Sequence, residues 1–394
     1  MSNNDQWLLP EGIEEVLPPE AWRLERARRE ILDLFSGWGF ELIMPPFIEY
    51  LESLLTGTGN DLDLQTFKLT DQLTGRLMGV RADMTPQAAR IDAHPLKRDV
   101  PSRLCYTGTV LRTRPDGFAG TRSPLQVGAE LFGHAGIESD VEILNLVLES
   151  LSVMGITEVH MDLGHVGIFR ALAAEAGLDE QQETALFDAL QRKASSEITG
   201  ILAASGASGD QGRRLACLAE LNGGYEVLAS ARESLAGAGN EVMAALDNLC
   251  AIADAMRRSR ADTVLFYDLA ELRGYNFHTG MVFAVFVPGR GQEIARGGRY
   301  NDIGKVFGGA RPATGFSMDL KTLVDLDTRE YDLSDGAIFS PADSDPALID
   351  TVRTLRAAGE RVLFDLPGQY GDAAAMGCDR VIVLENDVWV VKPV

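Results

Sequence analysis

Hydrophobic side chains recur every three or four positions near the start of the chain, over residues 19–35. This spacing predicts a helix with inward-facing Ala21, Leu24, Ala27, Ile31, Leu34 and Phe35. Prolines suit its first turn, and Gly37 and Gly39 end it. The next segment, FELIMPPFIEY, predicts a strand interrupted at Pro45 and Pro46, because proline cannot donate to a central ladder. We expect this segment at a sheet edge or an interface.

Short strand-like runs follow, separated by turn residues, and they predict mostly antiparallel pairing. They are TFKLTD, RLMGVRADM, RLCYTGTVLR and LQVGAELFG, with one short helix candidate, TPQAARIDAH, among them. A helix over residues 139–154 and a strand at TEVHMDLGHV come next. The pattern indicates an α+β fold in which helices flank an antiparallel sheet.

The pattern changes twice in the second half of the chain. Residues 178–260 are rich in Ala, Leu, Glu and Arg at helical spacing, which predicts a helical insertion. Strands return at TVLFYDL, MVFAVFV and EIARGG, and a last helix is predicted over residues 314–326. From residue 331 the pattern predicts a small α/β domain: GAIFS, helix DPALIDTVRTLRAAG, RVLFDL, a short helix, RVIVLEN and VWVVKPV. We expect a core domain over residues 1–330 and a C-terminal domain over residues 331–394.

Charge and composition narrow the possible partners. The 36 basic and 58 acidic residues give a net charge of −22, which opposes approach to phosphate backbones. We find no run of 18 apolar residues, and the first residues lack a basic segment followed by an apolar one, so we expect a cytoplasmic protein without membrane contact. The four cysteines are far apart and form no metal-binding motif, so we expect reduced thiols and no metal or cofactor.

Common catalytic signatures are missing, including a phosphate-binding loop and a nucleophile elbow. A spaced set of polar residues stands out instead: Arg81, Asp83, Thr85, Arg112, Gln126, Glu130, Arg273 and Arg299. Strand alternation would place Gln126 and Glu130 on one face, and likewise Asp83 and Thr85. Acids that receive an ammonium group and an arginine that receives a carboxylate could together hold an amino acid. Taken singly, each residue is more simply explained by a solvated strand face or a surface ion pair, and only the whole set favours a ligand site.

The order of the segments, over nearly 330 residues, resembles histidyl-tRNA synthetase, a class II aminoacyl-tRNA synthetase. GFELIMPPFIE resembles the dimer-forming first class motif, VRADMTPQAAR the loop that holds the histidine amino group, and LRTRP through LQVGAELFG the second class motif. LRGYNFHTGMVF resembles the histidine signature, and GGRYNDIGKVFGG with TGFSMDLKTL the third class motif. The resemblance implies a class II synthetase-like core.

The resemblance also implies a histidine-binding site. Asp83, Thr85 and Gln126 would face the α-amino group, Glu130 the imidazole, and Arg112 the ligand carboxylate or an α-phosphate. Arg273 stands at the signature arginine, and Phe277 and His278 stand where the family usually has two tyrosines.

Departures from the synthetase pattern concern the chemistry of ATP. Arg114 replaces a glutamate of the second motif, and Thr322 stands where an arginine of the third motif grips the nucleotide, with Asp319 and Lys321 where a glycine and a glutamate are usual. Threonine cannot supply the forked cation that stabilises charge on transferring phosphates. The short, acidic C-terminal domain also differs from an anticodon-binding domain, so we expect no tRNA binding and no catalysis.

This combination resembles the regulatory subunits of ATP phosphoribosyltransferase. The resemblance implies a non-catalytic protein that activates a short-form catalytic subunit and mediates feedback inhibition by L-histidine. It further implies a homodimer within a larger hetero-oligomer, a hetero-octamer. Two alternatives stay open at this point: an active histidyl-tRNA synthetase with unusual motifs, and a binding module of the same fold for another ligand.

Overall fold

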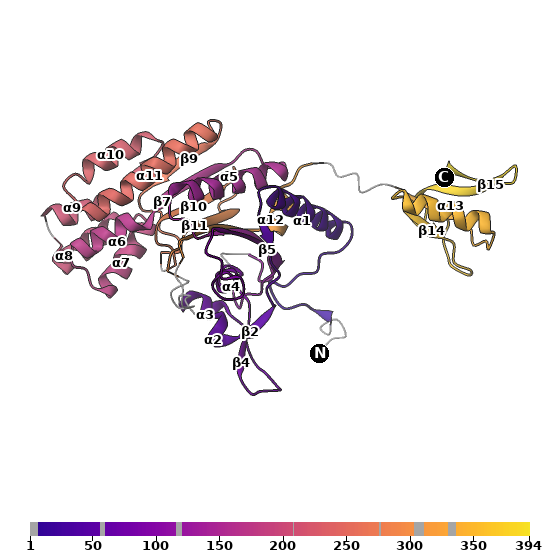
Figure 1. Ribbon diagram of the computed structural model, residues 1–394, viewed down its shortest axis with the longest axis horizontal. Helices are drawn as coiled ribbons and strands as arrows, with labels where there is room; N and C mark the ends of the chain where they lie inside the picture. Colours follow the sequence, from indigo (N-terminus) through magenta and orange to yellow (C-terminus); the bar gives the residue numbers. More distant parts are fainter. Residues whose placement is uncertain are drawn as a thin grey trace. The chain divides into compact units, whose positions relative to one another are not determined.

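A computed structural model describes residues 7–55, 60–115, 120–207, 209–275, 277–302, 311–329 and 336–394 (Figure 1). The chain forms two compact units, residues 1–328 and 329–394. The predicted boundary at residue 331, and residues 303–310 of the third-motif segment, lie outside the described residues. None of the described helices is both long and apolar enough to cross a lipid bilayer.

The larger unit is built on a mixed sheet in which antiparallel pairs predominate. Its strand order is β1-β5-β6-β12-β11-β10-β7-β9-β8, and only β1–β5 and β7–β9 are parallel pairs. In that order the strands are Glu41–Leu42, Ser102–Thr109, Leu125–Phe132, Ala313–Asp319, Ala295–Arg299, Met281–Phe286, His160–His165, Val264–Asp268 and Asn222–Gly223. This architecture agrees with the α+β prediction, and β1 lies at the sheet edge, as its neighbouring prolines require.

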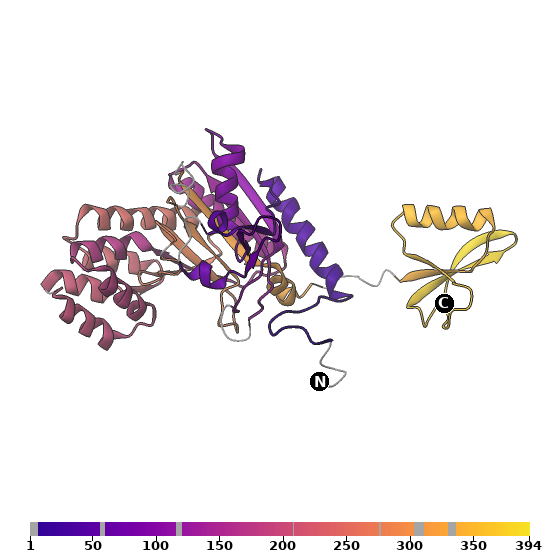
Figure 2. The same cartoon turned by 90° about the horizontal axis from the view of Figure 1, so that it is seen from below.

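Helices cover both faces of this sheet (Figures 1 and 2). The main hydrophobic core lies under α1 (Glu20–Gly37), α5 (Ile137–Val153) and α12 (Leu320–Leu326). On the opposite face, α4 (Thr85–Ile91) and a following π-helical turn (Asp92–Leu96) pack over a smaller cluster that includes Met84 and Tyr106. A three-stranded sheet, β2-β4-β3 (Ile48–Tyr50, Leu77–Val80, Lys68–Thr70), stands beside α2 (Leu51–Leu54) and α3 (Asn60–Gln65).

A helical block leaves the sheet after β7 and returns at β9. It contains α6 (Val166–Glu175), α7 (Glu180–Gln191), α8 (Ser195–Ser205), α9 (Gly209–Cys217), α10 (Glu226–Ser234) and α11 (Asn240–Ser259). Helix α7 begins with a capping box, in which the side chains of Asp179 and Gln182 each accept the other's backbone N–H. The helices therefore begin one element earlier than the predicted insertion, and the short strand β8 interrupts them.

The smaller unit is a four-stranded sheet with one helix. Its strand order is β14-β13-β15-β16 (Val362–Phe364, Ala337–Ser340, Cys378–Glu385, Val388–Pro393). Helix α13 (Pro346–Ala357) packs on the sheet through a core that includes Leu348 and Val352. Asp345 caps this helix and also accepts a hydrogen bond of 2.7 Å from the indole of Trp389.

Two predicted elements are wrong. The helix expected over residues 314–326 begins only at Leu320, because residues 313–319 form β12, which pairs with β6 on one side and β11 on the other. Gly315 has low helix propensity, and this double pairing overrides the helical spacing of the apolar residues. The short helix expected after β14 is absent, since residues 365–377 form turns around Gly368, Gly371 and Gly377, all with positive φ.

Candidate functional site

The central strand β6 carries the candidate site on the face that looks away from the main core. Val127, Ala129 and Leu131 enter that core, so Gln126 and Glu130 project to the opposite face together, as strand alternation predicts. Glycines on the neighbouring backbone leave room for the Glu130 and Tyr106 side chains. A Cβ atom at Gly315 would lie 1.6 Å from Glu130 Oε2, and one at Gly128 would lie 2.6 Å from the Tyr106 hydroxyl.

Two tyrosines hold the Glu130 carboxylate, Tyr106 from β5 and Tyr300 from the position directly after β11. The Tyr106 hydroxyl donates to Oε1 at 2.8 Å, and the Tyr300 hydroxyl donates to Oε2. Thr85 Oγ1 lies 3.1 Å from the Tyr106 hydroxyl and extends this network. Sequence reasoning missed both tyrosines. Tyr300 follows directly after the GGR run, which was a usable signal, whereas Tyr106 requires the register of β5 against β6.

Burial controls the charge of Glu130. Its residue is 1% exposed, and burial raises the pKa of the carboxyl from 4.5 to about 8, while the hydrogen bonds from Tyr300 and Tyr106 oppose that rise. A carboxyl with this pKa can change its protonation near neutral pH. It can therefore accept a hydrogen bond from an imidazole N–H once it is ionised.

The raised pKa predicts a pH-dependent stability. Between about pH 4.5 and 8 the folded chain keeps a proton on Glu130 that the unfolded chain has released. The stability contributed by this group is thus fully present below pH 4.5 and is lost progressively as the pH rises to about 8. Glu130→Gln cannot titrate, so urea unfolding of both proteins from pH 5 to 9 should show their difference changing within this window. A constant difference would contradict the raised pKa.

The predicted ammonium-binding residues come together at the start of α4. Asp83 Oδ1 accepts from the Thr85 backbone N–H and from Gln126 Nε2, both at 2.9 Å, and Gln126 Oε1 accepts from the Met84 N–H at 2.9 Å. Strand alternation suggested that Asp83 and Thr85 share a strand face, and this prediction is wrong. Thr85 is the first residue of α4, and a turn closed by the Asp83 side chain holds the two together.

The remaining predicted residues divide into two groups. The Phe277 ring packs against Tyr300 with 4.8 Å between ring centroids and a tilt of 34°. The His278 ring centroid lies 5.3 Å from that of Phe277 and 6.4 Å from that of Tyr300. Burial lowers the pKa of His278 to about 4, so this ring is neutral at physiological pH. Both therefore lie beside the Glu130 network.

Arg273 and Arg112 lie near acidic and backbone groups. The Arg273 guanidinium is 3.7 Å from Glu271 and 3.8 Å from Glu293. Arg112 Nε donates to the Ala82 carbonyl at 3.3 Å, directly before the Asp83 turn.

Arg81 and Arg299, which also stood out in the sequence, support the structure. Arg81 donates to the backbone carbonyls of Thr109 and Pro45. Arg299 is 6% exposed, and its Nε donates to both oxygens of the fully buried Asp140 at 3.0 and 3.1 Å.

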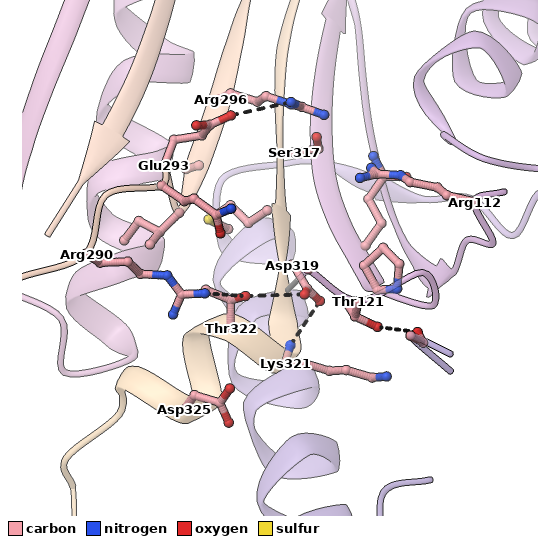
Figure 3. A pocket seen from close by; sticks show the side chains of 18 of the residues that line it. Arg112, Thr121, Arg290, Glu293, Arg296, Ser317, Asp319, Lys321, Thr322 and Asp325 are labelled. Atoms are coloured by element: carbon pink, nitrogen blue, oxygen red, sulfur yellow. Dashed lines mark hydrogen bonds and ion pairs between the residues drawn. The ribbon is translucent and has the colours of Figure 1, made fainter. Parts of the chain in front are cut away.

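A polar cavity of about 800 Å³ adjoins the Asp83 turn, and Arg112 and Gln126 both line it. Figure 3 shows Arg112 on one side of the cavity and Arg290 with Thr322 on the other. Arg290 donates to Thr322 Oγ1 at 3.4 Å, and that hydroxyl donates to Asp319 Oδ2 at 3.3 Å. The positive charges of the arginine and lysine side chains that line the cavity are balanced by four carboxylates, those of Glu14, Glu293, Asp319 and Asp325. This mixed lining differs from the cationic clamp that phosphoryl transfer needs.

Known protein families and relatives match this chain along nearly its whole length. Residues 12–323 match the histidyl-tRNA synthetase family, and residues 335–392 match the family described as ATP phosphoribosyltransferase subunit HisZ C-terminal domain. The ATP phosphoribosyltransferase regulatory subunit of Thioalkalivibrio sulfidiphilus is 63% identical over 386 residues, which are 98% of each chain. That of Alkalilimnicola ehrlichii is 57% identical over 394 residues, 100% of this chain and 98% of the relative.

Solved structures agree with these relatives. An ATP phosphoribosyltransferase regulatory subunit/histidyl-tRNA synthetase from Bacillus halodurans superposes with a TM-score of 0.83 at 27% identity, over 94% of this chain and 95% of that one. Histidyl-tRNA synthetase from Nostoc has a TM-score of 0.78 at 18% identity, over 98% and 94%, and shows the fold alone.

The fold and its site define a class II synthetase-like protein of the histidyl-tRNA synthetase type. Its catalytic-motif substitutions and the C-terminal match place it outside the working synthetases. The chain belongs to the ATP phosphoribosyltransferase regulatory subunits, which are non-catalytic paralogues of that synthetase in histidine biosynthesis.

Proposed function

We propose that this subunit binds L-histidine in the site around Glu130 and transmits that binding to a short-form ATP phosphoribosyltransferase catalytic subunit. The buried Glu130 carboxylate between Tyr106 and Tyr300 is the observation that carries the proposal. Once it is ionised, a buried carboxylate flanked by aromatic rings can accept an N–H from an imidazole and exclude ligands of other shape. The ligand imidazole therefore lies at Glu130.

The other end of the same ligand fits the neighbouring groups. The Asp83 carboxylate, positioned by Gln126, is an acceptor for the α-ammonium group. Arg112, which lines the adjoining cavity, is a cation for the α-carboxylate. Phe277 supplies an aromatic wall beside Tyr300, whereas Arg273 lies 3.8 Å from Glu293, which lines the cavity.

The coupling to the partner requires two states with different histidine affinity. The subunit activates the catalytic subunit in one quaternary state, and histidine binds the inhibited state more tightly. A coupling free energy of about 1–3 kcal/mol corresponds to roughly 5- to 150-fold inhibition. The proposed complex is cytoplasmic and includes neither tRNA nor a membrane.

The proposed assembly begins with a homodimer, extended by catalytic subunits to a hetero-octamer. Apolar side chains around Pro45 and Pro46 are exposed in the single chain, with exposed fractions of 44% for Leu42, 80% for Met44 and 45% for Phe47. A second copy of this chain would bury them across a two-fold axis. Their position beside the edge strand β1 supports this choice.

The test is phosphoribosyl-ATP formation by the purified short catalytic subunit, with and without this chain, across a histidine titration. We expect the rate to rise when the chain is added and to fall again as histidine saturates it. Heat-denatured chain is the control for non-specific protein effects. No change in rate on addition of the folded chain would overturn the proposed activation, and activation insensitive to histidine would overturn the proposed site.

A further inference from the structure

A short N-terminal segment forms one side of the polar cavity next to the proposed histidine site. We call residues 11–14 the N-terminal strap, and three of them, Gly12, Ile13 and Glu14, line the cavity. Between residues 7 and 20 every residue is exposed or half-buried. Polar contacts, and not a hydrophobic core, therefore hold the strap in place.

Hydrogen bonds from Arg122 are the first contacts that hold the strap. Its backbone N–H donates to the Gly12 carbonyl at 2.7 Å, and its guanidinium donates to the Glu11 carbonyl at 3.0 Å. Gly12 has a φ of +72°, and a Cβ atom there would lie 2.9 Å from Arg122 Cγ. Glycine at this position therefore lets the strap lie directly against the arginine stem.

A second contact, an ion pair, joins the strap to helix α12. Glu14 Oε1 lies 2.9 Å from Lys321 Nζ, although the two residues are 307 positions apart in sequence. Lys321 is in the first turn of α12, next to Asp319 and Thr322 at the cavity. The Glu14 side chain is 54% exposed, so solvent and salt weaken this ion pair.

The strap also connects to the proposed ligand groups. Arg122 Nε donates to the Arg112 carbonyl at 3.0 Å, and the Arg112 N–H donates to the Arg122 carbonyl at 2.9 Å. One arginine therefore holds both the strap and the backbone of the residue that would receive the ligand carboxylate. Arg112 and Gln126 line the same cavity as the strap.

We propose that the N-terminal strap is a gate over this cavity and that its release at Glu14–Lys321 controls how fast histidine enters and leaves the site. The inference rests on the proposed histidine site. A gate that opens more often speeds entry and exit alike, so it changes both rate constants and leaves the dissociation constant nearly unchanged. A strap that touched the ligand would instead change the dissociation rate and the affinity together.

Glu14→Gln tests the gate because it removes the charge of the ion pair and keeps the side-chain shape. Stopped-flow fluorescence with L-histidine should show association and dissociation rate constants that both rise by about two- to fivefold, the range for an exposed ion pair. Glu15→Gln is the matched control, since Glu15 is exposed and makes no hydrogen bond or ion pair with the described part of the chain. Its rates should equal those of the wild type.

A second variant, a chain that begins at Glu15, removes the strap without removing any buried residue of the described chain. Both rates should exceed those of Glu14→Gln and should no longer depend on salt. Unchanged rates in both variants, or a rise in the dissociation rate alone, would overturn the gate while histidine binding by the wild type still supports the proposed function. If calorimetry shows that the wild type binds no histidine, the proposed function itself fails, and the gate with it.

Discussion

Glu130→Gln should weaken L-histidine binding by roughly 10- to 150-fold, because the substitution removes the buried charged acceptor proposed for the imidazole. A hydrogen bond to a charged group contributes about 1.5–3 kcal/mol, and every 1.4 kcal/mol is about tenfold in affinity. Isothermal titration at a pH above 8, where the Glu130 carboxylate is ionised, measures this loss. Feedback inhibition of the complex should shift to higher histidine concentrations by the same factor.

Glu142→Gln is the control for a glutamate outside the site. Glu142 is on α5, and its carboxylate binds Arg103 at the surface. Histidine affinity should remain that of the wild type in this variant. Equal affinity in the wild type and in Glu130→Gln would show that the pocket serves another ligand or that the imidazole lies elsewhere.

Arg299→Met should lower the free energy of unfolding by about 3–5 kcal/mol, because it leaves the Asp140 carboxylate buried without its cation. Asp140 is 0% exposed, and Arg299 also donates to the His134 and Gly136 carbonyls. These bonds join β11 to the start of α5. Urea unfolding followed by circular dichroism measures the change.

The matched variant is Arg103→Met, which breaks an ion pair between β5 and the same helix. The Arg103 side chain is 37% exposed, so its loss should cost less than about 1 kcal/mol. The double variant Arg299→Met, Asp140→Leu should recover part of the stability, since an apolar pair leaves no buried charge. Equal losses for the Arg299 and Arg103 variants would contradict the importance of burial.

The spacing of apolar residues was sufficient to predict those helices and strands whose buried side chains recur at the period of the element itself. Helix α1 buries Ala27, Ile31 and Phe35, all three among the predicted inward positions. Strand β12 was missed because its conformation depends on neighbours more than 100 residues away in sequence. Gly315 fits there because Glu130 occupies the space above it, and no property of the segment alone reports that contact.

The candidate site shows the same division. Gln126 and Glu130 could be paired from strand alternation, since both lie on one regular strand. The Asp83 turn, Tyr106 and Tyr300 depend on how β5, β6 and α4 meet. Resemblance to histidyl-tRNA synthetase supplied candidate residues at these segments, but it could not show that Arg299 binds Asp140 and not a ligand.

The hydrogen bonds from two tyrosines to Glu130 fix this side chain before any ligand binds. Since folding itself immobilises and dehydrates this side chain, a histidine bound as proposed would not have to order it, and little side-chain entropy would be lost there on binding. In the proposed complex, substitutions around this site could then change the histidine concentration at which inhibition begins, without any change in the groups that touch the ligand. The histidine sensitivity of the proposed complex would thus depend on the packing of the sheet around Glu130.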